Sequence, residues 1–404
     1  MAKKLQADEW LFAATAGLAL FGVVMVYSAS ADIAFAQHGG DHYFYVKRQV
    51  MWTVAGLALM LAASQTDYTL LKRRGVVFAL LGITWVALIA VFGFSPTNGA
   101  RRWIKLPGMS LQPSEFSKLV LAVFLAWLLE RRAGEEGSIL RTLVPCLGVT
   151  SLLILLVAAE PDLGTAMMLG VICLVMLYTA GARALHLGAL GAVGGAAVAA
   201  MIIAAPWRMK RLWAFVDPWA DAQGTGYQVV QSLIAVGSGG TNGLGFAEGR
   251  QKMFFLPFAY SDYIFAVVGE ELGLVGSVTV LAVFGVFLWR GVRAALRAPD
   301  RFGMLLGMGI VAGIVAQALF NMSVVLSLVP SKGIPLPFIS YGGSSMLLTL
   351  GAVGVLLNIS QQGTEQAAAL HARVLAAATE RVATGRRRER AAVAPRAWRP
   401  EGRG

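Results

Sequence analysis

The chain has 404 residues, of which 57% are hydrophobic and only 14% are charged, and its mean hydropathy is +0.66. This composition excludes an ordinary soluble domain, because the surplus of apolar residues is gathered in long runs. The formal net charge of +12 comes partly from an Arg-rich C-terminal tail. Attraction to an anionic membrane surface explains such a tail better than nucleic-acid binding does, so the sequence predicts a membrane protein.

Ten apolar runs approach the ~20 residues that a helix needs to cross the ~30 Å hydrocarbon core of a bilayer. The first, at 10–28, follows a short basic start without a small-residue cleavage site, so we interpret it as an uncleaved first helix. The others lie at approximately 46–64, 76–94, 114–130, 142–159, 163–180, 187–205, 262–289, 303–328 and 343–360. The predicted fold is all-α, an integral membrane domain of about ten transmembrane helices over residues 10–360.

Lys and Arg residues between the runs indicate the orientation of the helices. They gather on alternate connections, at 72–74, 131–141 and 290–301 among others, and positively charged loops face the cytoplasm. The N-terminal segment 1–9 and the basic tail 361–404 are then both cytoplasmic, and the composition of the tail predicts disorder.

The longest connection, 206–261, is predicted to be a large extracytoplasmic loop. Trp207, Trp213, Phe215 and Trp219 indicate that its start lies at the membrane surface, where aromatic side chains are common. Its centre, GSGGTNGLGFAEG, lacks the preceding strand and the following GKS or GKT of a phosphate-binding loop, so it gives no support to nucleotide binding.

Three extracytoplasmic segments carry cations that the orientation rule does not expect there. They are Arg101, Arg102 and Lys105, then Arg208, Lys210 and Arg211, and finally Lys332. Pairing with outer lipid headgroups is one explanation. The other is that these side chains bind an anionic substrate presented from outside, since Arg and Lys are the usual partners of phosphate.

Metal and disulfide signals are weak in this chain. Cys146 and Cys173 lie in apolar runs, where buried thiols are the simplest interpretation, and the four histidines lack metal-ligand spacing. A divalent ion such as Mg²⁺ or Mn²⁺ would need oxygen ligands, for which Asp162 and Asp262 are candidates.

Two sequence blocks place acids near the predicted outer surface. In the block 98–119, Pro113 marks a helix start, and Glu115 and Lys118 are spaced to pair on one helical face, either as a structural ion pair or as part of a substrate site. In EPDLGTAM, at 160–167, the proline interrupts the helix. Asp162 there is either a helix cap, or a ligand for a divalent ion or a partner that orients the catalytic base.

Two further blocks lie on the same predicted side. Asp262 begins the run 262–289, which also contains Glu270 and Glu271, and acids at membrane depth indicate function more often than chance. A helix dipole alone would also stabilise Asp262. The segment 329–347 has three prolines and three glycines, which predict irregular backbone enclosed by protein or a wet cavity.

Together these blocks resemble the SEDS family of membrane proteins, whose members include FtsW and RodA. The resemblance covers residues 10–360 and is carried by NGARRWI, LQPSEFSKL, EPDLGT, VDPWAD, SDYIFAVVGEELG and PLPFISYGGSS. The SKG before IPLPFISYGGSS is more similar to FtsW, the division member, than to RodA, the elongation member.

The resemblance implies a ten-helix SEDS fold and a peptidoglycan glycosyltransferase that polymerises lipid II at the outer face of the bacterial cytoplasmic membrane. It implies a class B penicillin-binding protein as partner, with other division proteins at the septum, and no organic cofactor. The essential aspartate corresponds to Asp262, the motif tryptophan to Trp103, the ion pair to Glu115 and Lys118, and the EPDLGT acid to Asp162. Tyr260 and Ser261 precede Asp262 where the family often has His-Thr, so no mechanism that needs this histidine is expected.

General chemistry then suggests roles for the candidate residues. Asp262 is expected to be the general base, with a pKa raised by partial burial. The cations Arg101, Arg102, Arg211 and Lys332 are expected to bind the pyrophosphate leaving group, and Ser344 to line the same substrate site.

Three other functions stay open: a lipid II flippase, the RodA-like elongation polymerase, and a division scaffold. A carrier would place functional residues near the membrane midplane in related halves. The blocks of this chain lie on one side, and we see no internal repeat.

Overall fold

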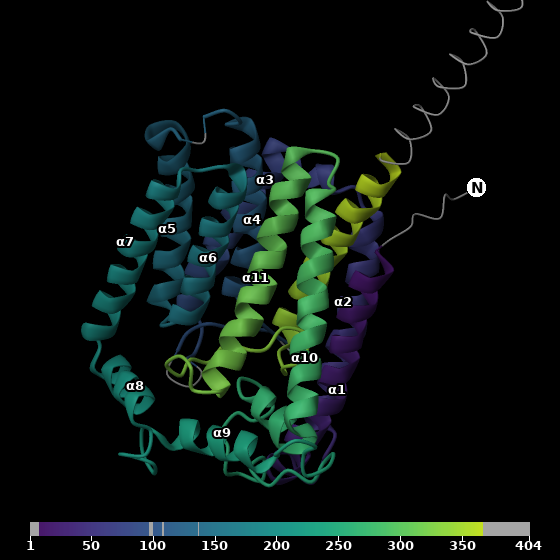
Figure 1. The fold of residues 1–404 in the computed structure, drawn as a ribbon, viewed down its shortest axis with the longest axis vertical. Coiled ribbons are helices and arrows are strands. Elements are labelled where there is room, and N and C mark those ends of the chain that lie inside the picture. Colours follow the sequence, from purple (N-terminus) through teal and green to yellow (C-terminus); the bar gives the residue numbers. More distant parts are fainter. Residues whose placement is uncertain (1–7, 97–99, 107–108, 136, 367–404) are drawn as a thin grey trace, which may run out of the picture.

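The computed structural model describes residues 8–96, 100–106, 109–135 and 137–366, which form a bundle of long helices (Figure 1). Ten of the described helices have 16 or more residues. They are α1 (Glu9–Gln37), α2 (Phe44–Gln65), α3 (Arg74–Ala90), α4 (Pro113–Arg131), α5 (Val144–Ala159), α6 (Leu163–Ala180), α7 (Ala184–Ile203), α10 (Ile264–Leu296), α11 (Arg301–Val325) and a final helix, Gly343–Gln366. The prediction of an all-α membrane domain with about ten long helices agrees with this architecture.

Eight of these helices are long and apolar enough to cross a membrane, α3 when it is continued to Gly93 and α5 when it is counted from Ile139. The other two, α2 and α4, carry charged residues near one end, Lys47 and Arg48 in α2 and Glu115 and Lys118 in α4. The helix α4 lies within the bundle, where it packs against α3, α6 and α11, and charge on an inner helix is tolerated where protein rather than lipid surrounds it. The helix α2 packs against α1 at the edge of the bundle, and Lys47 and Arg48 are exposed near its start.

The core of the bundle is formed by α4 and α11. Every residue of α4 from Val120 to Leu129 is buried, as expected for a helix that is apolar all round. Glycines of α11 permit close helix packing: a Cβ on Gly309 would meet the side chains of Met176 and Ala122. At the edge of the bundle, α7 has no buried residue, and it stands apart in Figure 1.

The segment 206–261 contains two helices, which the prediction of a single large loop did not include. They are α8 (Pro206–Val216) and α9 (Tyr227–Ser238), and both lie across the lower end of the bundle in Figure 1. The Ser232 hydroxyl of α9 donates to the Val325 carbonyl at the end of α11, over 2.8 Å. Trp207, Trp213 and Trp219 are exposed, and their placement at the membrane surface stays a prediction.

The glycine-rich segment 237–249 forms hydrogen bonds with α10 where that helix is interrupted. Gly273 has φ 63° and ψ −159°, so the helix is interrupted there. The Leu274 and Val275 amides donate to the Gly240 and Thr241 carbonyls, over 2.9 and 3.1 Å. In return, the amides of residues 244 and 245 donate to the carbonyls of residues 270 and 271, each over 3.0 Å. Glycines are needed because a Cβ on Gly243 would lie 2.1 Å from the residue 271 carbonyl oxygen.

Glu270 and Glu271 hold this same loop instead of facing a site. Glu270 accepts hydrogen bonds from the Arg250 and Gln251 amides, and Glu271 pairs with Lys252 over 2.6 Å and accepts from the Ser28 hydroxyl. All three charged side chains of this group, Glu270, Glu271 and Lys252, are buried. These acids at membrane depth are therefore structural.

Several short elements complete the fold. A hairpin of β1 (Ile104–Leu106) and β2 (Met109–Leu111) precedes α4, with Ile104 paired to Leu111. Three short helices are η1 (Tyr68–Lys72), η2 (Val91–Gly93) and η3 (Ile139–Leu143). Three-residue strands are too short to give a periodic pattern, which is why the hairpin was not predicted.

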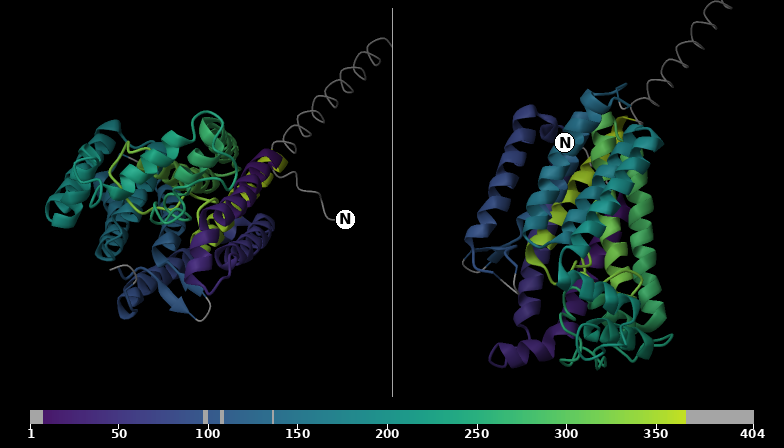
Figure 2. Two further views of the ribbon diagram at one scale, coloured as in Figure 1. Left: turned by 90° about the horizontal axis from the view of Figure 1, so that it is seen from below. Right: turned by 90° about the vertical axis from the view of Figure 1, so that its left-hand side faces the viewer.

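Both ends of the described chain lie toward the end of the bundle opposite α8 and α9 (Figures 1 and 2). This arrangement fits an even number of spans. The final helix continues to Gln366, so the predicted tail boundary at 361 is too early. The segments 1–7 and 367–404, with the disorder predicted for the tail, lie outside the described residues.

Candidate functional site

A cavity of about 950 Å³ opens between segments that are distant in the sequence. Its walls come from α2, residues 100–105 and 110–112, the start of α4, the α5–α6 turn, α8, residues 258–262 and residues 332–345. Nine of the residues proposed from the sequence line it: Arg102, Trp103, Lys105, Glu115, Asp162, Arg211, Asp262, Lys332 and Ser344. The structure thus brings all four blocks to one shared space.

Asp262 lies in the coil before α10, which begins at Ile264 and not at Asp262 as predicted. Its carboxylate lies against Gly333, where an added Cβ would be 2.6 Å from Oδ2. Burial raises the pKa of Asp262 to about 6, and Asp162 raises it further, while Arg102 and Arg211 oppose this shift. The carboxylate is therefore mostly ionised at neutral pH and can still accept a proton.

Asp162 is the cap of α6 and also lines the cavity. Its carboxylate accepts hydrogen bonds from the Thr165 amide at 3.2 Å, the Thr165 hydroxyl at 2.8 Å and the Gln112 side-chain amide at 3.2 Å. The helix break at Pro161 is confirmed, because α5 ends at Ala159 and α6 begins at Leu163. Asp162 therefore caps α6, as one of the two interpretations predicted, and it also lies at the cavity.

Glu160 is fully buried beside this turn. Among the described residues, neither of its carboxylate oxygens has a hydrogen-bond partner. Burial and the nearby Asp162 raise the pKa of Glu160 to about 8, against the opposing effect of Arg102. The Arg102 guanidinium donates to the carbonyls of Glu160 and Pro161, over 3.2 and 2.6 Å, which holds it at the cavity wall.

Three cations surround Trp207 on the α8 side. The charged groups of Arg208, Arg211 and Lys332 lie 4.8, 5.6 and 5.9 Å from the ring centroid. Burial lowers the pKa of Lys332 to about 8, helped by the neighbouring positive charges. Within the part of the chain that the structure describes, neither Arg211 nor Lys332 forms an ion pair, so this wall suits an anion.

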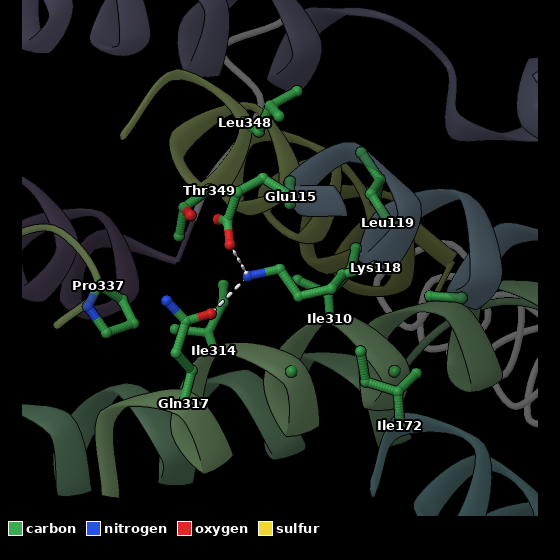
Figure 3. Close-up of a pocket in the computed structure, with 14 residues that line it drawn as sticks. Glu115, Lys118, Leu119, Ile172, Ile310, Ile314, Gln317, Pro337, Leu348 and Thr349 are labelled. Carbon is green, nitrogen blue, oxygen red and sulfur yellow. Dashed lines mark hydrogen bonds and ion pairs between the residues drawn. The ribbon is translucent and has the colours of Figure 1, made fainter. Parts of the chain in front are cut away.

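Glu115 and Lys118 form the predicted ion pair, with 2.8 Å between Nζ and Oε1. Figure 3 shows Lys118 directed toward both Glu115 and Gln317, in a second cavity of about 40 Å³. Glu115 lines both cavities, whereas Lys118 lines only the smaller one. The other Glu115 oxygen accepts from the Ser345 hydroxyl at 2.7 Å, so the pair is connected to the substrate side through Glu115.

Arg101 does not reach the large cavity, which corrects its proposed role. Its side chain is exposed and donates to the Phe92 carbonyl over 2.8 Å. Ser344 does line the cavity, and its hydroxyl accepts from the Gln112 amide over 3.3 Å.

Arg48 and Trp52 of α2 line the cavity but were not proposed from the sequence. A signal was available, because Lys47 and Arg48 are basic residues at the extracytoplasmic end of a predicted span, and Trp52 lies one helical turn further. Lys47 pairs with Asp41 over 3.0 Å, whereas Arg48 faces the cavity. Tyr260 and Tyr341 also line the cavity; their rings contact each other, with centroids 5.8 Å apart.

No group of three or more metal-ligating side chains occurs among the described residues. The acids at the large cavity are Glu115, Asp162 and Asp262. Glu115 already binds Lys118 and Ser345. A divalent ion at Asp162 and Asp262 would take its remaining ligands from water or from substrate phosphates, as Mg²⁺ often does.

The fold and the cavity define a class of protein: a multi-pass helical membrane protein with a charged cavity at one end of its bundle. The chain belongs to the cell cycle protein family of FtsW, RodA and SpoVE, whose model matches residues 9–365. This is the SEDS family that the motifs indicated, so the predicted family is confirmed.

Two curated relatives match most of the chain. Stage V sporulation protein E of Bacillus subtilis (strain 168) is 41% identical over 360 residues, which cover 89% of this chain and 98% of the relative. The probable peptidoglycan glycosyltransferase FtsW of Geobacter sulfurreducens (strain DL-1 / KN400) is 40% identical over 344 residues, which cover 85% of this chain and 92% of the relative.

Solved structures share the fold. A chain described under "Structural coordination of polymerization and crosslinking by a peptidoglycan synthase complex" matches with a TM-score of 0.70 and 28% identity, covering 89% of this chain and 99% of that one. The rod shape determining protein RodA of Thermus thermophilus matches with a TM-score of 0.65 and 27% identity, covering 89% and 98%. The predicted SEDS fold is confirmed by these similarities.

Proposed function

We propose that this protein is a peptidoglycan glycosyltransferase that polymerises lipid II at the outer face of the bacterial cytoplasmic membrane. Curated relatives at about 40% identity carry the name peptidoglycan glycosyltransferase FtsW. The observation that carries the proposal is the large cavity, where the Asp262 carboxylate shares one space with the cations Arg211 and Lys332, which have no ion-pair partner among the described residues.

In the reaction, a sugar hydroxyl of one lipid-linked disaccharide attacks the anomeric carbon of the growing chain. The bond from that carbon to the lipid pyrophosphate breaks, and the lipid pyrophosphate leaves. Asp262 removes the hydroxyl proton, because its pKa of about 6 leaves it ionised but still basic enough at neutral pH. Direct displacement of an α-linked donor gives a β-linked product by inversion and needs no covalent enzyme intermediate.

The leaving pyrophosphate accumulates negative charge as the bond breaks. Arg211 and Lys332 bind it, because they are close together and positive and have no ion-pair partner among the described residues. Arg102 contributes charge beside the α5–α6 turn, where its guanidinium is held by two carbonyls. Trp103 and Ser344 line the same space and contact the rest of the substrate.

A Mg²⁺ or Mn²⁺ ion belongs to the proposal through Asp162. Asp262 would be a ligand only in the alternative in which another group takes the hydroxyl proton. When bound, the ion would neutralise charge on the pyrophosphate. Asp162 can hold it with the face of the carboxylate that the α6 cap leaves at the cavity.

A class B penicillin-binding protein, the crosslinking partner, and a place at the division septum complete the proposal. A structurally similar chain is described as part of a peptidoglycan synthase complex. The division role is favoured over the elongation role because the curated relatives named FtsW reach about 40% identity, whereas the solved RodA is 27% identical. Both termini are proposed to be cytoplasmic.

Reconstitution with the crosslinking partner and preformed lipid II tests the proposal. We expect glycan chains from the wild type and a loss of about 10²–10⁴-fold in polymerisation with Asp262→Asn. Asp41→Asn, the same change at an acid that pairs with Lys47 outside the cavity, should polymerise like the wild type.

Two results would count against the proposal. Translocation of lipid II without any polymer would indicate the flippase. An Asp262→Asn protein with full activity would remove the base assignment but not the polymerase. An assay with a chelator, compared with one at saturating Mg²⁺, tests whether the metal is needed, independently of the base assignment and of the choice between polymerase and flippase.

A further inference from the structure

Two amide side chains on α11 hold the backbone around the cavity. The Gln317 amide donates to the Pro335 carbonyl over 2.9 Å, and one helical turn later the Asn321 amide donates to the carbonyls of Ile334 and Asp262, each over 2.7 Å. Both side chains are buried. These carbonyls belong to irregular backbone, which must find its hydrogen bonds outside regular helix or strand.

Asn321 joins the two segments that carry the reacting charges at the points nearest Asp262 and Lys332. The same segments also contact each other further along, where the Ser340 hydroxyl donates to the Ser261 carbonyl over 2.6 Å and the Tyr341 amide donates to the Tyr260 carbonyl over 3.0 Å. One hydrogen of the Asn321 Nδ2 reaches the segment with Asp262, and the other reaches the segment that follows Lys332 and Gly333. Within the described residues its Oδ1 has no partner, so the two carbonyls alone orient the amide. The Asp262 carboxylate lies against Gly333, directly beside this bridge.

We propose that Asn321 is a positioning residue that sets the separation between the Asp262 carboxylate and the Lys332 ammonium. A general base and an anion-binding group must be held at a fixed distance for one bond to form while another breaks. Asn321 touches neither substrate nor reacting atoms. It acts through the main chain of the two segments, and this role rests on the proposed function of Asp262.

The ion pair on α4 supports the same bridge. Figure 3 shows Gln317 beside Lys118, and the Gln317 oxygen accepts a hydrogen bond from that ammonium. The chain of contacts therefore runs from Ser345 through Glu115 and Lys118 to Gln317, and ends on the Pro335 carbonyl. It holds the segment 335–345 at both of its ends.

Asn358 offers a matched control at the other end of the bundle. Its amide donates to the Ser64 carbonyl over 2.8 Å and its oxygen accepts from the Tyr68 amide over 3.0 Å. It is buried like Asn321, with 5% and 1% of the side chains exposed. Replacing either residue with alanine therefore removes a similar helix-to-backbone clamp, but only one of them lies beside the cavity.

The test compares Asn321→Ala and Asn358→Ala in the reconstituted polymerase with its crosslinking partner, at equal amounts of folded protein. For Asn321→Ala we expect kcat to fall about 10- to 100-fold while KM for lipid II stays within about threefold. For Asn358→Ala we expect kcat within about twofold of the wild type, even where thermal stability falls by a similar amount.

A kcat for Asn321→Ala equal to that of the wild type would overturn the proposal, as would the same kinetic loss in Asn358→Ala. If Asn321→Ala does not fold, Asn321→Ser, which keeps one donor, is measured in the same way and judged by the same outcomes. Asp262→Asn in parallel separates the two ideas: an active Asp262→Asn removes the base, whereas an inactive one with normal Asn321→Ala removes only the positioning role.

Discussion

Cations at the two ends of the bundle differ in whether they have a carboxylate partner. At the end away from the cavity, Lys72 pairs with Glu130 over 2.6 Å and with Asp300 over 3.4 Å, and Arg290 pairs with Asp8 over 2.7 Å. These two partly buried cations each have a carboxylate partner. At the cavity, Arg211 and Lys332 have no carboxylate partner among the described residues, although Asp162 and Asp262 line the same space.

This difference separates charges that hold the fold from charges that are reserved for a ligand. Pairing offsets the cost of desolvating a buried ion. Cations that lie together without partners therefore do not stabilise the fold. The lowered pKa of Lys332 shows that cost. Perturbed, unneutralised groups in a cavity are a known mark of functional sites, and here they lie opposite the proposed base.

The largest effect is expected at a paired charge that is deeply buried. Lys252→Met removes the partner of Glu271 from a pair whose side chains are 4% and 0% exposed. An uncompensated buried carboxylate costs about 3–5 kcal/mol, so thermal unfolding in detergent should occur at a clearly lower temperature. As a control, Arg141→Ala breaks a pair that is 69% and 37% exposed and should cost about 0.5 kcal/mol or less. Equal stability of the two variants would contradict the comparison.

A smaller effect, and one on function, is expected at the unpaired charges. Lys332→Gln and Arg211→Gln should each raise KM for lipid II about 10- to 100-fold, since a hydrogen bond to a charged group is worth about 1.5–3 kcal/mol, without loss of thermal stability. Arg290→Gln should do the reverse, because its partner is Asp8. A normal KM in both cavity variants would show that these cations do not bind the substrate.

The smallest expected effect is a shift of one limb of the pH profile. Activity should rise as pH passes about 6, where Asp262 loses its proton, and fall as pH passes about 8, where Lys332 loses its own. Lys332→Arg keeps the positive charge to higher pH, so the alkaline limb of kcat/KM should move up while the acid limb stays. An alkaline limb that does not move would assign it to another group.

Most of the helices and the convergence of the four blocks could be predicted from the sequence. Apolar runs near 20 residues and alternating basic loops are local signals. They predicted the helices and the side of the membrane on which all four blocks lie. The pairing of Glu115 with Lys118 depends only on a spacing of three within one helix. These features need no knowledge of distant contacts.

The remaining features depend on contacts between distant segments. Asn321 was one polar residue in an apolar run, and nothing local to α11 indicates that it meets the carbonyls of Asp262 and Ile334. Arg101 and Arg102 are adjacent and chemically equal, yet only Arg102 lines the cavity. The roles of Glu270 and Glu271 were misjudged for the same reason, since their partners lie in a loop about twenty residues earlier and in α1.

The break at Gly273 has a consequence for how motion reaches the cavity. The amides of Leu274 and Val275, which start the second part of α10, donate to residues 240 and 241, and the carbonyls of residues 270 and 271, which end its first part, accept from residues 244 and 245. Both parts of α10 are therefore bound to the loop that follows α9. Hydrogen–deuterium exchange at the amides of Leu274 and Val275 therefore reports whether that loop is seated, and not whether the helix frays. A protein that docks on this loop would change the exchange there before it changed anything in the membrane-spanning part of α10.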